Sequence, residues 1–214
     1  MPGPAYEETV FINCPFDEAY APLLEAATFT CVYLGFHPQL ASNNLEAGEN
    51  RFEKIVRMVK AAKYSIHDLS RNTAAKKGDV FRMNMPFEFG LDFGLRKSGS
   101  KKFRQKKFLI FELKRFDLKK SLSDVAGQDV AYHDGSYEKI IKAIRDFFHA
   151  EAGTNAAGAT YIKSNYETFQ GWLTEKKISE GHSEDEALNL PSHERIGEMW
   201  VWMQLGRPSA FSQI

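Results

Sequence analysis

Hydrophobic and polar positions alternate between two patterns along the first 150 residues. Short runs of β-branched and aromatic residues, bounded by Pro, Gly or polar residues, are typical of buried strands. Between these runs, apolar residues recur every three or four positions, as on one face of a helix. The predicted strands cover residues 9–14, 36–41, 64–68, 107–112 and 130–132. The predicted helices cover residues 20–34, 52–62, 87–97 and 137–148.

This alternation predicts an α/β protein with a three-layer, flavodoxin-like or Rossmann-like arrangement. Strands that alternate with helices form a parallel sheet with helices on both faces, because the crossover connections are right-handed. Ligands of such sheets bind at the carboxyl ends of the strands. The loops expected to carry a site therefore begin at Asn13, Ala41, Asp68 and Glu112.

A change in composition near residue 150 marks the end of the predicted α/β domain, residues 1–150. Residues 151–160 are small and Gly-rich, which predicts a linker. Residues 161–214 predict a helical appendage, because they carry two apolar stripes at helical spacing. We expect both stripes to dock on the α/β domain or on a second subunit. The stripes are Ile162, Tyr166, Phe169 and Leu173, and Ile196, Met199, Trp200 and Met203.

The composition narrows the class of protein. The 28 basic and 28 acidic residues give a net charge of zero, which argues against charge-driven binding of nucleic acid. Cys14 and Cys31 cannot build a disulfide framework, and the His residues lack metal-ligand spacing. The chain shows no signal peptide and no apolar run of membrane-spanning length. We therefore expect a cytoplasmic protein without a cofactor or metal.

The chain has neither a P-loop nor a Gly-x-Gly-x-x-Gly motif after the first strand. The most specific signal is instead a pair of segments, residues 65–71 and 84–91. Asp68 ends a predicted strand, and Glu88 falls in the first turn of a helix predicted to begin near Pro86, where the helix dipole favours a carboxylate. Taken singly, Asp68 could cap a turn and Glu88 could complement the dipole. Together they predict a carboxylate pair in a cleft.

These segments carry a resemblance to a known family. The Asp-Leu-Ser strand end at Asp68, the Phe-Glu-Phe-Gly helix start at Phe87 and the opening segment 10–17 resemble nucleoside 2-deoxyribosyltransferases and the related TIR-like nucleotide-binding proteins of bacteria. The resemblance covers about residues 8–150. It implies an enzyme that cleaves or exchanges the N-glycosidic bond of a nucleoside or NAD-type nucleotide, with a role in bacterial signalling or defence.

The resemblance also implies residue roles. Glu88 matches the glutamate that attacks or electrostatically supports the anomeric carbon, and Asp68 matches a carboxylate that contacts the base or ribose. Asn13 and Phe16 match the loop that covers the nucleoside. A carboxylate close to the anomeric carbon stabilises the oxocarbenium character that develops as the bond breaks. The other residues expected to bind the substrate are Asp17, Ser70, Arg71, Asn84 and Met85.

The sequence leaves the roles of several other residues open. A second aspartate of the transferase type is Asp79 or Asp92. The basic residues between positions 97 and 107 form a solvated loop or contact a phosphate or nucleic acid. His67 precedes Asp68 in a strand and should therefore point to the opposite face of the sheet, as a core histidine.

Three functions fit these observations. The first is an N-glycosidic enzyme, which requires Glu88 in an open pocket near Asp68. The second is a non-catalytic module that senses a nucleotide and signals through the helical tail, which requires the pocket but not Glu88. The third is an assembly module in which TIR-like domains stack into homo-oligomers, which requires neither.

Overall fold

The computed structural model describes residues 3–41, 50–71, 83–98, 100–125 and 127–211. Its strands form one five-stranded parallel sheet in the order β2-β1-β3-β4-β5. This is the flavodoxin-like strand order, and it confirms the predicted α/β class. The strands are β1 (Thr9–Asn13), β2 (His37–Leu40), β3 (Tyr64–Asp68), β4 (Lys107–Glu112) and β5 (Val130–Tyr132).

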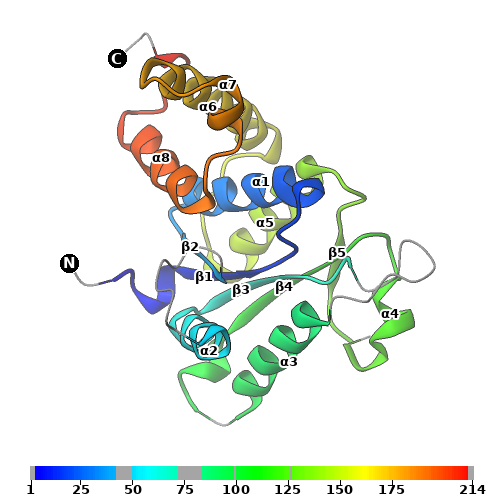
Figure 1. Ribbon diagram of the computed structural model, residues 1–214. Coiled ribbons are helices and arrows are strands. Elements are labelled where there is room, and N and C mark those ends of the chain that lie inside the picture. The colour runs from blue at the N-terminus through cyan, green and yellow to red at the C-terminus, as the bar shows by residue number, and fades with distance from the viewer. Residues whose placement is uncertain (1–2, 42–49, 72–82, 99, 126, 212–214) are drawn as a thin grey trace.

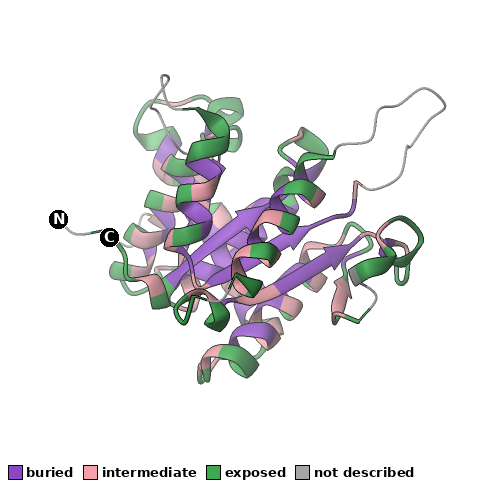
Figure 2. Ribbon diagram, turned by 90° about the horizontal axis from the view of Figure 1, so that it is seen from below, coloured by how far each residue is buried: buried purple, intermediate pink, exposed green. Residues whose placement is uncertain are grey.

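Helices cover both faces of the sheet (Figure 1). Strand side chains alternate between the faces: Val10 and Ile12 pack under α1 and α5, whereas Phe11 packs against α2. Figure 2 shows the strands buried along most of their length, while the outer surfaces of the helices are exposed. One face carries α1 (Ala21–Tyr33) and α5 (Tyr137–Ala152), and the other carries α2 (Arg51–Ala61) and α3 (Asn84–Lys97).

Local signals in the sequence set the ends of these helices. The Asn50 side chain caps α2 by accepting a hydrogen bond from the Phe52 N–H at 2.9 Å. Ser136 caps α5 in the same way, and α5 ends at Gly153, whose φ of 67° lies in the left-handed region that glycine favours. The short connecting elements are η1 (Tyr6–Glu8), η2 (Glu18–Tyr20), η4 (Phe103–Gln105), α4 (Leu118–Ser121) and η5 (Ser123–Val125).

The C-terminal segment forms α6 (Ala159–Ser179), α7 (Glu184–Leu188) and α8 (Ser192–Gln204). Helices α6 and α8 lie against α1, α6 also lies against α5, and α7 packs on α6 (Figure 1). The connection from α5 to α6 is residues 153–158, shorter than the linker expected at 151–160. Trp172 and Trp202 are fully buried there, and both pack in one cluster with Phe29 from the outer face of α1. The tail therefore shares a hydrophobic core with the α/β domain.

The helices of the described residues include none that combines the length and the apolar character needed to cross a membrane.

Candidate functional site

The fold creates a topological switch point between β1 and β3. From β1 the chain crosses to β2 on one side, and it then returns to β3 on the other side of β1. The loops that follow β1 and β3 therefore leave the sheet in different directions, which opens a crevice at the carboxyl ends of these strands. This crevice is where doubly wound sheets bind their ligands.

A cavity of about 260 Å³ lies at this edge of the sheet. The loop after β1, the first residue of α2 and the first two turns of α3 supply its walls. The sequence candidates that line it are Asn13, Phe16, Asn84, Met85 and Glu88. Cys14, Pro15 and Arg51 complete the lining. The structure thus brings together the opening segment and the Glu88 segment.

Glu88 is 6% exposed, and burial raises its pKa from 4.5 to about 7, with Arg51 acting in the opposite direction. The expected start of the helix is corrected by the structure. Because α3 begins at Asn84, Glu88 is its fifth residue and lies outside the first turn. The stabilising effect of a helix dipole on a carboxylate falls off within that first turn. Desolvation therefore governs Glu88, and the carboxyl is partly protonated near neutral pH.

Asp68 is fully buried but is not among the residues that line this cavity. It is in phase with Tyr64 and Ile66 of β3, so it faces the layer of α1 and α5 rather than α3. Its Oδ2 accepts a hydrogen bond from the Tyr20 hydroxyl at 2.6 Å, and its Oδ1 accepts one from the Ser70 N–H at 2.9 Å. Asp68 therefore lies behind the wall of the cavity that Glu88 lines, and both carboxylates act on the thiol of Cys14.

Three other candidates also lie outside the lining of the cavity. Arg71 donates to Asp17 at 2.9 Å and thereby ties the loop after β3 to the loop after β1. Ser70 is buried and binds Asp68 through its backbone. These contacts give Asp17, Ser70 and Arg71 the role of holding the two loops together beside the cavity.

A buried polar network lies behind the cavity wall at Asn13, and the sequence analysis did not predict it. The side-chain amide of Asn13 donates to the Met85 carbonyl at 2.9 Å and lies 3.1 Å from His67 Nδ1. The amide nitrogen of Asn13 can only donate hydrogen bonds, so His67 Nδ1 is the acceptor of this pair. The ring proton of His67 is then on Nε2, which donates to Asp92 at 3.2 Å. The remaining polar atom of the Asn13 side chain is its oxygen, an acceptor, and Asn13 is one of the residues that line the cavity.

Asp92 is the centre of this network. Its Oδ2 accepts from the Ser65 hydroxyl at 2.5 Å, and its Oδ1 lies 3.2 Å from Lys106 Nζ. Burial acts to raise the pKa of Asp92, but His67, Lys106 and Ser65 outweigh it and hold that pKa below its ordinary value. Burial in turn lowers the pKa of Lys106, which Asp92 partly offsets.

Two sequence interpretations are settled by this network. His67 is a fully buried core histidine on the face opposite Asp68, as predicted. Lys106 is fully buried, so it is not part of a solvated basic loop. The sequence did carry a signal for this network. Ser65 and His67 are polar residues on one face of an otherwise apolar strand, and Asp92 is an acidic residue in the following helix. Asp92 lies in this network rather than in the cavity, and Asp79 falls outside the described residues.

Cys14 lines the cavity but is unsuited to act as a nucleophile. Burial raises the pKa of its thiol well above the ordinary value, and the carboxylates of Asp68, Glu88 and Asp17 raise it further. A thiol in such surroundings stays protonated and is a poor nucleophile. Among the titratable residues of the cavity wall, Glu88 is therefore the better candidate for covalent chemistry.

Within the described residues, no group of three or more His, Cys, Asp or Glu side chains is arranged to hold a metal ion. Comparisons with protein-family models, with curated proteins and with solved structures find no match for this chain.

Proposed function

We propose that this protein cleaves or exchanges the N-glycosidic bond of a nucleoside or NAD-type nucleotide, with Glu88 as the catalytic carboxylate. The observation that carries this proposal is a buried carboxyl group with a raised pKa in a cavity at the switch point of the sheet. Buried titratable groups with perturbed pKa values concentrate at functional sites. The motifs around Asp68 and Glu88 add the resemblance to nucleoside 2-deoxyribosyltransferases.

The reaction follows from the chemistry of the carboxylate. A Glu88 oxygen forms a bond to the anomeric carbon of the sugar while the bond from that carbon to the base breaks, and the base leaves with the bonding electron pair. The base of a nucleoside then takes up a proton from water, whereas the nicotinamide of an NAD-type nucleotide leaves as the neutral molecule. Water or a second base then attacks the same carbon and releases the Glu88 carboxylate. Water gives hydrolysis, and a second base gives exchange.

The other lining residues fit the binding of the substrate. The Asn13 side-chain oxygen accepts a hydrogen bond from a sugar hydroxyl, and the half-exposed Phe16 ring offers a stacking surface for the base. The buried network through His67 and Asp92 fixes the orientation of the Asn13 amide. We assign Asp68 a positioning role, because it holds Tyr20 and the loop at Ser70 rather than lining the cavity.

The size of the cavity favours the sugar and part of the base as the enclosed portion. Sites for small molecules commonly measure about 300–1,000 Å³, and this cavity of about 260 Å³ lies just below that range. A larger nucleotide would extend out of the cavity past Arg51, which is exposed at its wall.

The test is incubation of the full chain with NAD and a panel of nucleosides, with and without a second free base, followed by chromatographic detection of released or exchanged base. Glu88→Gln should lower turnover at least about a hundredfold, since it removes the carboxylate while keeping the shape. Glu53→Gln, at an exposed position on α2, is the matched control and should leave turnover unchanged.

The pH dependence provides a second readout. Base release should increase as pH rises through about 7, because the attacking form of Glu88 is the ionised one. Undiminished release from Glu88→Gln would overturn the proposal. Nucleotide binding without base release in the native protein would instead support the sensing module.

A further inference from the structure

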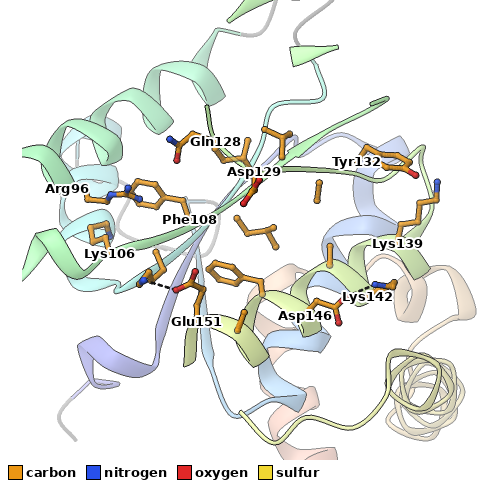
Figure 3. Close-up of a pocket in the computed structure, with 18 of the residues that line it drawn as sticks. Arg96, Lys106, Phe108, Gln128, Asp129, Tyr132, Lys139, Lys142, Asp146 and Glu151 are labelled. Carbon is orange, nitrogen blue, oxygen red and sulfur yellow. Dashed lines mark hydrogen bonds and ion pairs between the residues drawn. The ribbon is translucent and has the colours of Figure 1, made fainter. Parts of the chain in front are cut away.

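A second and larger cavity lies along the other side of the sheet (Figure 3). It measures about 870 Å³ and shares no lining residue with the Glu88 cavity. We call it the edge groove, because β4, β5, one side of α5 and the end of α3 line it. The proposed function makes no use of it.

The groove exists because β5 is shorter than β4. The three residues of β5 pair with Ile110, Phe111 and Glu112, so residues 107–109 of β4 have no strand opposite them among the described residues. Backbone groups of alternate residues in a parallel strand point to the same neighbour. Lys107 and Phe111 bond toward β3, so the N–H and C=O of Phe108 point toward the open side.

The two walls of the groove differ in charge. On the α5 wall, the acidic residues are paired: Glu151 with Lys107 of β4 at 2.7 Å, and Asp146 with Lys142 at 2.5 Å. Between them, α5 presents apolar side chains such as Phe147. This wall therefore offers apolar contact and little net charge.

The opposite wall carries uncompensated positive charge. Arg96 from α3 lies over the Phe108 ring at 5.0 Å, and Arg104 comes from η4, which packs against α3. Neither arginine has a carboxylate within ion-pair distance in the part of the chain that the structure describes. In a chain with no net charge, unpaired guanidinium groups beside an open sheet edge point to an anionic partner.

We propose that the edge groove binds an extended, acidic segment of a partner protein, which adds to β4 as a strand beside residues 107–109. Strand addition supplies backbone partners for Phe108, and alternate side chains of the added strand point to opposite walls. Apolar side chains would contact Phe147, and acidic side chains would meet Arg96 and Arg104. Figure 3 shows Arg96 at one end of the groove and Asp129 nearer its middle, so the acidic side chains would lie away from Asp129.

Two other occupants fit less well. A second copy of this chain would bring the same arginines together at a shared edge, which like-charge repulsion disfavours. Nucleic acid would satisfy the arginines, but it has no row of amide and carbonyl groups to pair with the open backbone of β4.

The experiment uses the full chain and a fluorescent heptapeptide with alternating Glu and Val, blocked at both ends. Fluorescence anisotropy should show binding of this peptide and none of the matching Lys and Val peptide. Arg96→Glu and Arg104→Glu should each weaken binding at least tenfold. Lys60→Glu, an exposed charge reversal on α2, should change the affinity less than twofold.

Backbone methylation of the peptide tests strand addition itself. Only alternate amides of an added strand face β4, so N-methylation of either all Val or all Glu residues should abolish binding while the other pattern should not. Binding should also slow hydrogen exchange at the Phe108 amide.

Three outcomes would overturn the proposal. The first is binding that neither methylation pattern weakens, or that both weaken equally. The second is equal binding of an oligothymidylate of the same charge, which would make the groove a general anion surface. The third is peptide affinity unchanged by both arginine reversals. These outcomes are independent of base release, so they leave the proposed function untouched.

Discussion

A buried carboxylate lies on each side of the sheet at β3, Asp92 of α3 on one side and Asp68 of β3 itself on the other, but different partners hold them. Asp92 lies beside a cation, Lys106, and also contacts His67 and Ser65. Asp68 accepts hydrogen bonds from the hydroxyl of Tyr20 and the backbone N–H of Ser70, and His133 Nε2 lies 3.3 Å from its Oδ2. Removing one partner of a buried ion pair leaves an unpaired charge, whereas removing a neutral donor leaves one lost hydrogen bond. The two faces should therefore respond very differently to substitution.

The largest effect is expected for Lys106→Met. This change removes the cation beside Asp92, and it also removes the donor to the carbonyls of Val59 and Ala62 near the end of α2. The free energy of unfolding should fall by about 3–5 kcal/mol, measured by urea denaturation at neutral pH. Lys60→Met, at an exposed position on the same helix, is the control and should stay within about 0.5 kcal/mol of the native protein. A Lys106→Met protein as stable as that control would show that Asp92 does not need the cation.

Glu88→Gln should have an intermediate effect on stability, with a sign that depends on pH. The folded-state pKa of Glu88 is raised from 4.5 to about 7, so folding keeps the proton on, and the native protein loses stability as pH rises between these values. The glutamine variant has no such loss. Relative to the native protein it should therefore gain about 3 kcal/mol between pH 4.5 and pH 8. Urea denaturation of both proteins at pH 4.5 and pH 8 measures this gain. The prediction is contradicted if the free energies of unfolding of variant and native protein differ by the same amount at both pH values.

The smallest of the three effects is expected for Tyr20→Phe on the Asp68 face. It removes one hydrogen bond to a carboxylate, while Ser70 still donates to Asp68 and His133 Nε2 still lies 3.3 Å from it. The loss of stability should be about 2 kcal/mol, clearly less than for Lys106→Met in the same assay. A loss equal to that of Lys106→Met would show that the two faces are held equally strongly.

Much of the fold could be predicted because strand and helix periodicities are local properties of the sequence. The predicted strands at residues 64–68, 107–112 and 130–132 match β3, β4 and β5. The predicted cavity residues after β1 and in α3 were found because chain topology brings strand ends to one edge. The face of the sheet to which the His67 side chain points also followed from the alternation of side chains along the strand.

The remaining features depended on contacts between distant parts of the chain. Strand alternation placed His67 on one face of the sheet, and the same rule places Asp68 on the other, outside the lining of the Glu88 cavity. Lys106 belongs to a run of basic residues, and only the closeness of Asp92 and the end of α2 shows that it is buried. The expected helix start near Pro86 was late by two residues, which misplaced Glu88 relative to the helix dipole.

The position of α1 between two hydrophobic cores has a consequence for synthesis of the protein. Its inner residues pack on the sheet, while Ala26, Phe29 and Val32 pack against α6 and α8, which are encoded more than 120 residues later. Ribosomes add about 5–20 residues per second, so these side chains wait at least about 6 s for their partners. During that time the nascent chain presents an apolar helix surface to the cell, where chaperones are the natural protection against aggregation.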